Sequence, residues 1–212
     1  MKADMAGLQG GGYRTVAVSS REKPSFAAMT AGKAQFGLLG AAAMISAGNT
    51  IVRENNVEDP AVYIGNALAA RLSEKLGLQV SDNGGKVTDV TKPDQLATQY
   101  AGSDLLLDVQ TVNWSFVYFP TDWNNYRVIY SAKLRLIDTR NRKLLAEGFC
   151  AHAPADAEGS PSRDQLLADK AARLKSELRI AADHCVPDFA AKVLGIFESK
   201  VAESAPAANQ AG

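Results

Sequence analysis

The sequence predicts an α+β fold in which helices cover a mixed sheet that ends in an antiparallel β-meander. Three observations indicate this fold. Residues 104–152 contain three strand-like segments joined by short turns, residues 59–77 carry the cap residues of an amphipathic helix, and residues 162–184 repeat apolar side chains at helical spacing. The expected element order is β-α-β-α-β-β-β-α-α.

Both ends of the chain are expected to lie outside the folded domain. Residues 1–12 are rich in Gly and are typical of a flexible lead-in, and residues 202–212 have the Ala-rich, polar composition of a disordered tail. No apolar segment of a signal peptide follows Met1. The residues between, 13–201, are expected to form a single domain.

The domain is expected to begin with a short strand and an apolar stretch. Residues 13–20 alternate with the period of a strand, which we expect to pair with the meander after a crossover. Residues 36–52 carry no charge and are slightly fewer than the roughly 20 needed to cross a hydrocarbon core. They form either a buried helix or loop, or a segment that contacts a membrane or another subunit. The candidate contact residues are Phe36, Leu38, Leu39, Met44 and Ile45.

Residues 59–77 are predicted to form a helix that covers one face of the sheet. Asp59 is the expected N-cap, Pro60 occupies the first helical position, and Gly77 ends the helix. A short strand at 78–80 and a short helix at 93–100 follow. The predicted apolar stripe of the long helix comprises Val62, Ile64, Leu68, Ala69, Leu72 and Leu76.

The meander is predicted to contain strands at 104–119, 123–138 and 143–152. In the middle strand the even-numbered residues from 126 to 136 are apolar and the odd-numbered ones are mostly polar. We therefore expect another element to cover the apolar face. Leu105-Leu106-Leu107 fills both faces of the first strand, which indicates a position near the sheet centre. On the third strand, one side is assigned to Leu144, Ala146, Gly148 and Cys150.

Two helices are expected after the meander. The first covers 162–184, with Ser162 as a cap and Pro187 as its stop, and the second covers 189–201.

Cys150 and Cys185 are the two cysteines of the chain. Packing of the 162–184 helix across the sheet can bring them together, so we expect a disulfide bond formed in an oxidising compartment. Two free buried thiols are one alternative. Another is a zinc site that adds His152 and His184, but the spacing matches no established zinc motif and adjacent ligands strain a tetrahedral centre. We therefore expect no metal.

The sequence shows no catalytic constellation. It has no Gly-x-Ser-x-Gly, no phosphate-binding Gly-rich loop and no His-Glu-x-x-His. Asp104 and Asp108 lie four apart on one strand face and could form a site. The simpler interpretation is that Asp104 ends a turn and that Asp108 hydrogen-bonds a neighbouring strand or faces solvent. We expect a non-enzymatic protein without a cofactor.

The charges indicate no nucleic-acid partner. Lys and Arg together number 23, as do Asp and Glu, so the whole molecule offers no attraction for a polyanion. No nucleic-acid-binding motif is present.

Six aromatic residues crowd the first hairpin of the meander. Cross-strand pairing explains them structurally. The functional alternative is an exposed patch for another protein subunit or a lipid-like ligand. The candidates are Trp114, Phe116, Tyr118, Phe119, Trp123 and Tyr126.

The order of the segments resembles bacterial envelope lipoproteins. The resemblance rests on the Gly/Ala-rich apolar segment, the helix start Glu58-Asp59-Pro60, the strand Asp104-Leu105-Leu106-Leu107-Asp108-Val109 and the meander end Lys143-Leu144-Leu145-Ala146-Glu147-Gly148. The nearest groups are auxiliary lipoproteins of transport and assembly systems, and more distantly the curli-secretion-channel type. The resemblance covers 13–201 and implies a removed signal peptide, a lipid anchor upstream of Lys2 and a periplasmic location at the outer membrane.

The sequence thus leads to one main functional hypothesis and two alternatives. The main hypothesis is a periplasmic accessory protein that acts through contacts with other envelope proteins. The first alternative is a ring- or pore-forming secretion component that self-associates or meets the membrane through 36–52. The second is a small-molecule-binding domain.

Overall fold

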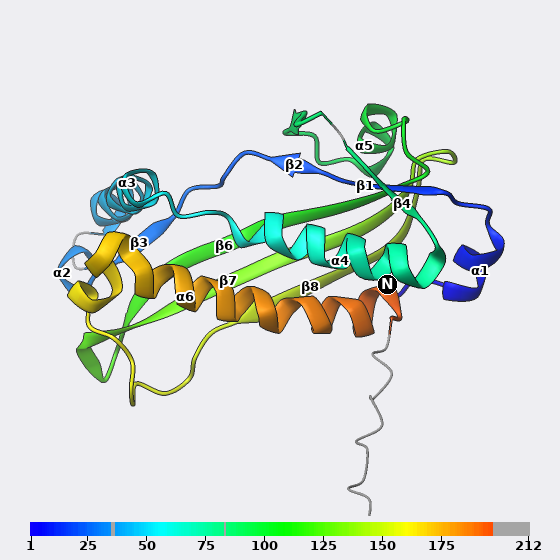
Figure 1. Cartoon of the computed structure of the whole chain (residues 1–212). Helices are drawn as coiled ribbons and strands as arrows, with labels where there is room; N and C mark the ends of the chain where they lie inside the picture. Colours follow the sequence, from blue (N-terminus) through cyan, green and yellow to red (C-terminus); the bar gives the residue numbers. More distant parts are fainter. Residues whose placement is uncertain (35–36, 83, 197–212) are drawn as a thin grey trace, which may run out of the picture.

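The computed structural model describes residues 1–34, 37–82 and 84–196, and it has the α+β fold that the sequence predicts. Helices α4 (Pro60–Leu76) and α6 (Arg163–Phe189) lie side by side on one face of the sheet and run in the same direction (Figure 1). Helix α3 (Gly37–Asn55) lies at one end of the molecule, and α1 (Met5–Gly10) lies at the other.

In the described residues the main sheet has six strands, five of them in the order β4-β1-β6-β7-β8. Strand β6 (Leu105–Phe119) is central, as its apolar start predicts. Its first residues pair in parallel with β1 (Thr15–Val18) and its last residues pair in parallel with β3 (Ala27–Met29). The crossover that joins β1 to the meander is therefore confirmed. Strand β1 also pairs with β4 (Gln79–Ser81).

Strand β7 (Asp122–Asp138) confirms the alternation, because its even-numbered residues from Tyr126 to Leu136 are buried. The prediction for β8 (Lys143–His152) was wrong at one residue. A register shift between Leu136 and Ile137 turns Leu144 to the opposite face from Ala146 and Cys150. One extra residue in a strand reverses the side-chain alternation beyond it.

Helix α4 begins and ends where its cap residues predict. The Asp59 carboxylate accepts a hydrogen bond from the Ala61 N–H at 2.9 Å, and Gly77 adopts φ +68°, the left-handed conformation of a C-cap. Val62 was wrongly included in the buried stripe, since its side chain is exposed. It lies in the first turn of α4.

Helix α6 begins at the predicted cap but does not stop at Pro187. The Ser162 hydroxyl accepts a hydrogen bond from the Gln165 N–H, and the Gln165 side chain accepts one from the Ser162 N–H. The helix continues through Pro187 to Phe189 and into the π-helical turn η1 (Ala190–Leu194). The carbonyl that Pro187 leaves without a donor belongs to Asp183, an exposed residue, so water can satisfy it.

Residues 1–12 are folded and are not the flexible lead-in that their composition predicts. The Asp4 side chain caps α1, Leu8 is buried, and the Ala3 N–H donates a hydrogen bond to the Val193 carbonyl at 2.8 Å. The segment gains order from hydrogen bonds to η1 and to the Glu147 backbone, which local composition does not reveal. Part of the predicted helix at 189–201 and all of the predicted tail at 202–212 lie outside the described residues.

Besides α1, four short elements of the described residues were not predicted. Strands β2 (Ser20–Arg21) and β5 (Val87–Thr88) pair with each other in parallel, and β3 and α2 (Ala31–Ala34) precede α3. The main apolar core lies between the sheet and the α4/α6 layer. A smaller apolar cluster on the other face packs α5 (Pro93–Gln99) against Leu106 and Ile137.

Candidate functional site

Helix α3 is anchored to the sheet through its second half. Gly48 packs so closely that a Cβ atom there would lie 2.0 Å from the Phe26 carbonyl oxygen. The Asn49 side chain accepts a hydrogen bond from the Phe26 N–H at 2.9 Å, and Val52 is buried. Small and apolar residues on this inner face therefore hold α3 against β3.

The other side of α3 is apolar and open. Leu38 is 91% exposed, Leu39 82% and Ile45 42%, and the alanines at 41 and 42 are exposed too. Leu38, Ala41, Ala42 and Ile45 have the i, i+3, i+4, i+7 spacing of one helix face, with Leu39 beside it. We call these five residues the α3 outer face. The described part of this segment, residues 37–52, is therefore a helix that is buried on one side only, and contact with a membrane or another subunit stays a prediction.

Two further candidates of that segment have other positions. Met44 is half-buried, and Phe36 lies outside the described residues. Among residues 1–34, 37–82 and 84–196, no helix is both long enough and apolar enough to span a membrane.

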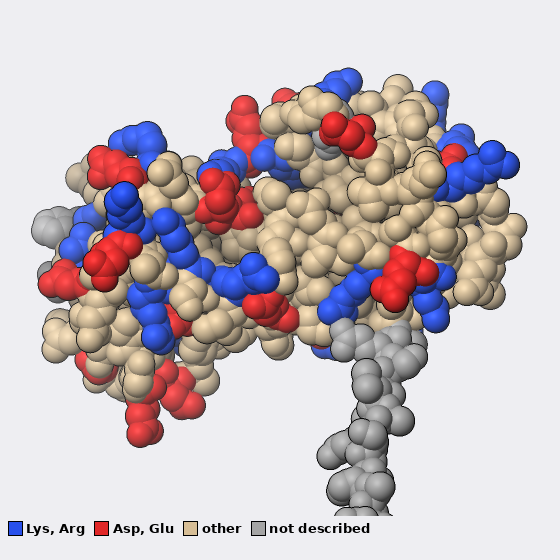
Figure 2. Space-filling model, viewed as in Figure 1, with Lys and Arg blue, Asp and Glu red and all other residues tan. Residues whose placement is uncertain are grey.

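The α3 outer face differs in chemistry from the surface over α4 and α6. There, Lys and Arg side chains are interspersed with Asp and Glu (Figure 2). Between Lys33 and Arg53 the sequence has no charged residue. An apolar helix face without charges is a surface that binds by excluding water.

Four of the six aromatic candidates belong to the core. Trp114, Phe116, Phe119 and Tyr126 are buried, and the Phe116 and Tyr126 rings meet edge to face with centroids 5.6 Å apart. Phe26 from the segment before β3 contacts Trp114 in the same geometry at 5.2 Å. The interpretation of these four as an exposed patch was therefore wrong, because they are buried in contacts between strands and with the segment before β3.

The remaining two aromatic candidates lie at the tip of the hairpin. Tyr118 is half-buried and Trp123 is 60% exposed, with ring centroids 6.5 Å apart. They leave a single exposed ring, and not a continuous aromatic surface.

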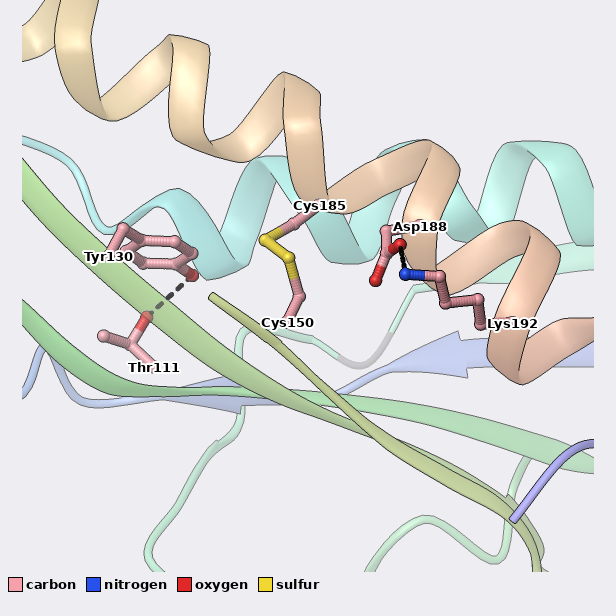
Figure 3. Close-up of a disulfide and its surroundings, with 6 residues drawn as sticks. All are labelled: Thr111, Tyr130, Cys150, Cys185, Asp188 and Lys192. Atoms are coloured by element: carbon pink, nitrogen blue, oxygen red, sulfur yellow. Dashed lines mark hydrogen bonds and ion pairs between the residues drawn. A yellow bond between two sulfur atoms is a disulfide. The ribbon is translucent and has the colours of Figure 1, made fainter. Parts of the chain in front are cut away.

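Cys150 and Cys185 form the predicted disulfide bond, with the sulfur atoms 2.00 Å apart. It joins β8 to α6 across the main core, close to the hydrogen-bonded pair Thr111 and Tyr130 (Figure 3). His152 and His184 lie near it, with ring centroids 5.1 Å apart. Within the described part of the chain, no group of three or more His, Cys, Asp or Glu side chains is arranged to hold a metal.

Asp108 is the centre of a buried ion cluster and does not face solvent. Its carboxylate accepts hydrogen bonds from Arg21 Nε at 2.7 Å, from Arg135 at 2.9 and 2.6 Å, and from the Ser19 hydroxyl at 2.7 Å. Burial raises the pKa of the Asp108 carboxyl, but the hydrogen bonds and charges of Arg21, Ser19 and Arg135 outweigh it and hold this pKa below its usual value. A fully paired carboxylate has no capacity left for catalysis or ligand binding.

Asp104 does not join Asp108 in a site. Its carboxylate accepts the backbone N–H groups of Arg14 and Thr15 at 2.7 and 3.1 Å, and these hydrogen bonds lower the pKa of the Asp104 carboxyl. It therefore fixes the start of β1. The simpler interpretation, in which the two carboxylates have separate structural roles, is confirmed, because each has its own set of donors.

A third buried carboxyl group lies under the start of α4. The Asp59 cap accepts a hydrogen bond from the Thr111 hydroxyl, whose oxygen lies 3.0 Å from the Tyr130 hydroxyl. Burial raises the pKa of the Asp59 carboxyl and, more strongly, that of the Tyr130 hydroxyl.

A pocket of about 270 Å³ opens between the start of α4 and the middle of α6. Asp59, Val57 and Leu178 line its interior, and Lys175 and Arg179 lie along the α6 side. The Arg179 guanidinium carbon stacks 3.6 Å from the centroid of the Tyr63 ring, and its Nε donates to Asp183 at 3.0 Å.

The comparisons with known proteins find distant structural similarity alone. No protein-family model and no curated protein matches the chain. Among solved structures, lipoprotein GNA1162 from Neisseria meningitidis is 17% identical with a TM-score of 0.31, over 82% of this chain and 99% of that one. The hypothetical protein CT253 from Chlamydia trachomatis is 13% identical with a TM-score of 0.41, over 85% and 95%. The PelC dodecamer from Paraburkholderia phytofirmans is 13% identical with a TM-score of 0.34, over 82% and 88%.

A bacterial lipoprotein is thus among the solved structures that this chain resembles at low similarity. These values assign neither a family nor an activity to the chain.

Proposed function

We propose that this chain is a non-enzymatic accessory protein of a bacterial envelope transport or assembly system, and that it acts through protein–protein contacts at the α3 outer face. The observation that carries the proposal is the exposure of Leu38 and Leu39, at 91% and 82%, on a helix whose opposite side is packed. Leaving such side chains in water forgoes about 1.5–3 kcal/mol of burial each. Contiguous exposed apolar residues mark interaction sites in soluble proteins.

The α3 outer face fits a partner of defined chemistry. None of its five residues is charged, and its alanines allow the backbone of another helix to approach closely. We therefore propose that the partner is another envelope protein that presents an uncharged apolar helix. The shape suits helix-against-helix docking, in which Leu38 and Ile45 flank the alanines.

The disulfide bond supports the envelope location. Disulfides persist in oxidising compartments such as the periplasm and are rare where thiols are kept reduced. In the proposed arrangement, a lipid anchor upstream of Lys2 in the precursor holds the domain at the outer membrane.

Photo-crosslinking tests the docking surface. A benzophenone amino acid is placed at Leu39 in one variant and at Val112 of β6, which is 57% exposed on another element, as the matched control. In envelope fractions, we expect one discrete cross-linked partner from position 39 and none from position 112. Identical patterns from both positions, or no adduct from position 39, would contradict the proposal.

Self-association through the same face is the competing outcome, as in the ring-forming alternative. Light scattering of the purified protein decides between them. A monomer at micromolar concentration, with a cross-linked partner of different mass in the envelope, supports the accessory role. An adduct of position 39 whose mass is a multiple of the chain supports assembly from copies.

The pocket between α4 and α6 favours small-molecule binding as a second candidate function. Its lining combines apolar residues with the cationic side chains of Lys175 and Arg179 and the acidic side chains of Glu58 and Asp59, a combination that suits a partly apolar ligand carrying both charges. A thermal-shift screen of such compounds, repeated with Leu178→Trp to fill the pocket, tests it. A stabilising compound whose effect survives the filled pocket binds elsewhere.

A further inference from the structure

The only two histidines of the chain come together although they are 32 positions apart in the sequence. His152 ends β8 and His184 lies on α6, and their ring centroids are 5.1 Å apart with the planes inclined at 46°. The disulfide fixes this arrangement, because Cys150 lies two residues before His152 and Cys185 directly follows His184. The pair is therefore held by a covalent link between its two elements.

The ring separation matches the value expected for two imidazole ligands of one metal ion. A zinc–imidazole bond of about 2.0–2.1 Å places the ring centre about 3.2 Å from the metal, so two rings at a tetrahedral angle have centres about 5.2 Å apart. The observed 5.1 Å agrees with this value. The ring planes are inclined at 46°, so the imidazoles are not stacked in parallel.

The acidic side chains nearest the pair already have cationic partners of their own. Glu177 is paired with Arg173 at 2.7 Å, and Asp183 is held by Arg179. His184 is exposed, so water can reach an ion at the pair and complete its coordination.

We propose that His152 and His184 form a two-imidazole site for a divalent transition-metal ion of the class that prefers imidazole ligands, such as Zn²⁺ or Cu²⁺. The ion bridges β8 and α6 beside the disulfide bond, and water molecules occupy its remaining positions. The site is independent of the α3 outer face.

Metal titration of the oxidised protein, made without a histidine tag, tests the site. Calorimetry and thermal unfolding are followed with Zn²⁺, with Mg²⁺ as a cation that prefers oxygen ligands. We expect one Zn²⁺ per chain and a rise in Tm with Zn²⁺ alone, because an ion that binds the folded state stabilises it. His152→Gln and His184→Gln should each lose this rise while keeping the metal-free Tm.

A spectroscopic measurement on the unmodified protein does not depend on how the variants fold. Electron paramagnetic resonance of the Cu²⁺-loaded protein should show two imidazole nitrogens, and since the chain has two histidines, both must contribute. A single coordinated nitrogen, no stoichiometric binding, or a Tm rise that persists in either variant would overturn the proposal.

Discussion

The Asp108 carboxylate and the Arg135 guanidinium face each other on neighbouring strands 2.6 Å apart, with side chains that are 0% and 6% exposed. Arg21 adds a second cation at 2.7 Å from the far side. Arg21 reaches Asp108 because β1 and β3 pair with the two ends of β6 and leave the edge of β6 between them unpaired. The ion cluster therefore ties the β2–β5 region to the open part of the sheet.

Asp108→Asn should be strongly destabilising. The substitution removes the anion and leaves two arginines buried without a counter-charge, and breaking a buried pair costs about 3–5 kcal/mol. Urea unfolding at neutral pH measures the loss. Asp104→Asn is the comparison, and we expect a smaller loss because that carboxylate holds backbone N–H groups at a more exposed position. Equal effects would contradict the assigned role of the cluster.

The Asp108 carboxyl should also make the unfolding free energy depend on pH in the acid range. The pKa of Asp108 is lower in the folded state than in the unfolded state, so its contribution to stability is complete above the unfolded value of about 3.9 and disappears as the pH falls through the folded value. Unfolding free energy measured from pH 6 downward should fall more steeply in the wild type than in Asp108→Asn. Parallel curves would show that other groups dominate.

Loss of the disulfide should lower the unfolding free energy by on the order of 4 kcal/mol, the loop-entropy value for the sequence separation of 35 between Cys150 and Cys185. Denaturant titration of the Cys150→Ala/Cys185→Ala variant measures this loss. The single variants should lose a similar amount, because either one removes the link. A double variant with wild-type stability would show that non-covalent packing alone holds α6 to β8.

Gly48→Ala should detach α3 from β3. The new Cβ would lie 2.0 Å from the Phe26 carbonyl oxygen, a backbone atom that cannot move aside independently, and overpacking costs about 1–3 kcal/mol. Gly32→Ala is the matched control, since nothing lies within 4 Å of its added Cβ. Hydrogen exchange of the α3 amides should accelerate in the first variant and stay unchanged in the second. Unchanged exchange in both would mean that α3 is held elsewhere.

Leu38→Ser and Leu39→Ser should leave folding almost unaffected. Their side chains are exposed and contribute little to the core, and surface substitutions change stability by about 0.5 kcal/mol or less. Thermal unfolding measures this, and Leu68→Ser, a fully buried position of α4, provides the contrast. A large loss in the α3 variants would indicate that the outer face supports the fold and would weaken its role as a docking surface.

The sequence predicted the parts of the fold that local patterns determine. Alternation located β7 and its buried face, and the caps located α4. Leu144 was misplaced because a register shift depends on the pairing of two strands. Residues 1–12 were misjudged because their order comes from contacts with a segment at the opposite end of the chain.

For the α3 outer face, the sequence predicted the apolar segment but not which side of the helix is exposed. The apolar stretch identified α3, but composition does not tell which side of a helix finds a neighbour; Gly48 facing Phe26 decides it. The Arg21–Asp108–Arg135 cluster was missed. A usable signal existed for one pair, since Asp108 and Arg135 lie at nearly equal distances from the 120–122 turn, as cross-strand partners in a hairpin must.

The parallel placement of β1 also bears on how the chain folds. Both neighbours of β1 are synthesised later, with Thr15 opposite Gln79 and Val16 opposite Leu105, whereas the meander pairs segments that follow one another. Local contacts form faster than distant ones. In pulsed hydrogen exchange during refolding we therefore expect the β6 and β7 amides to become protected before those of β1. Until then the free edge of β6 can accept the N-terminal strand of a second chain as well as its own.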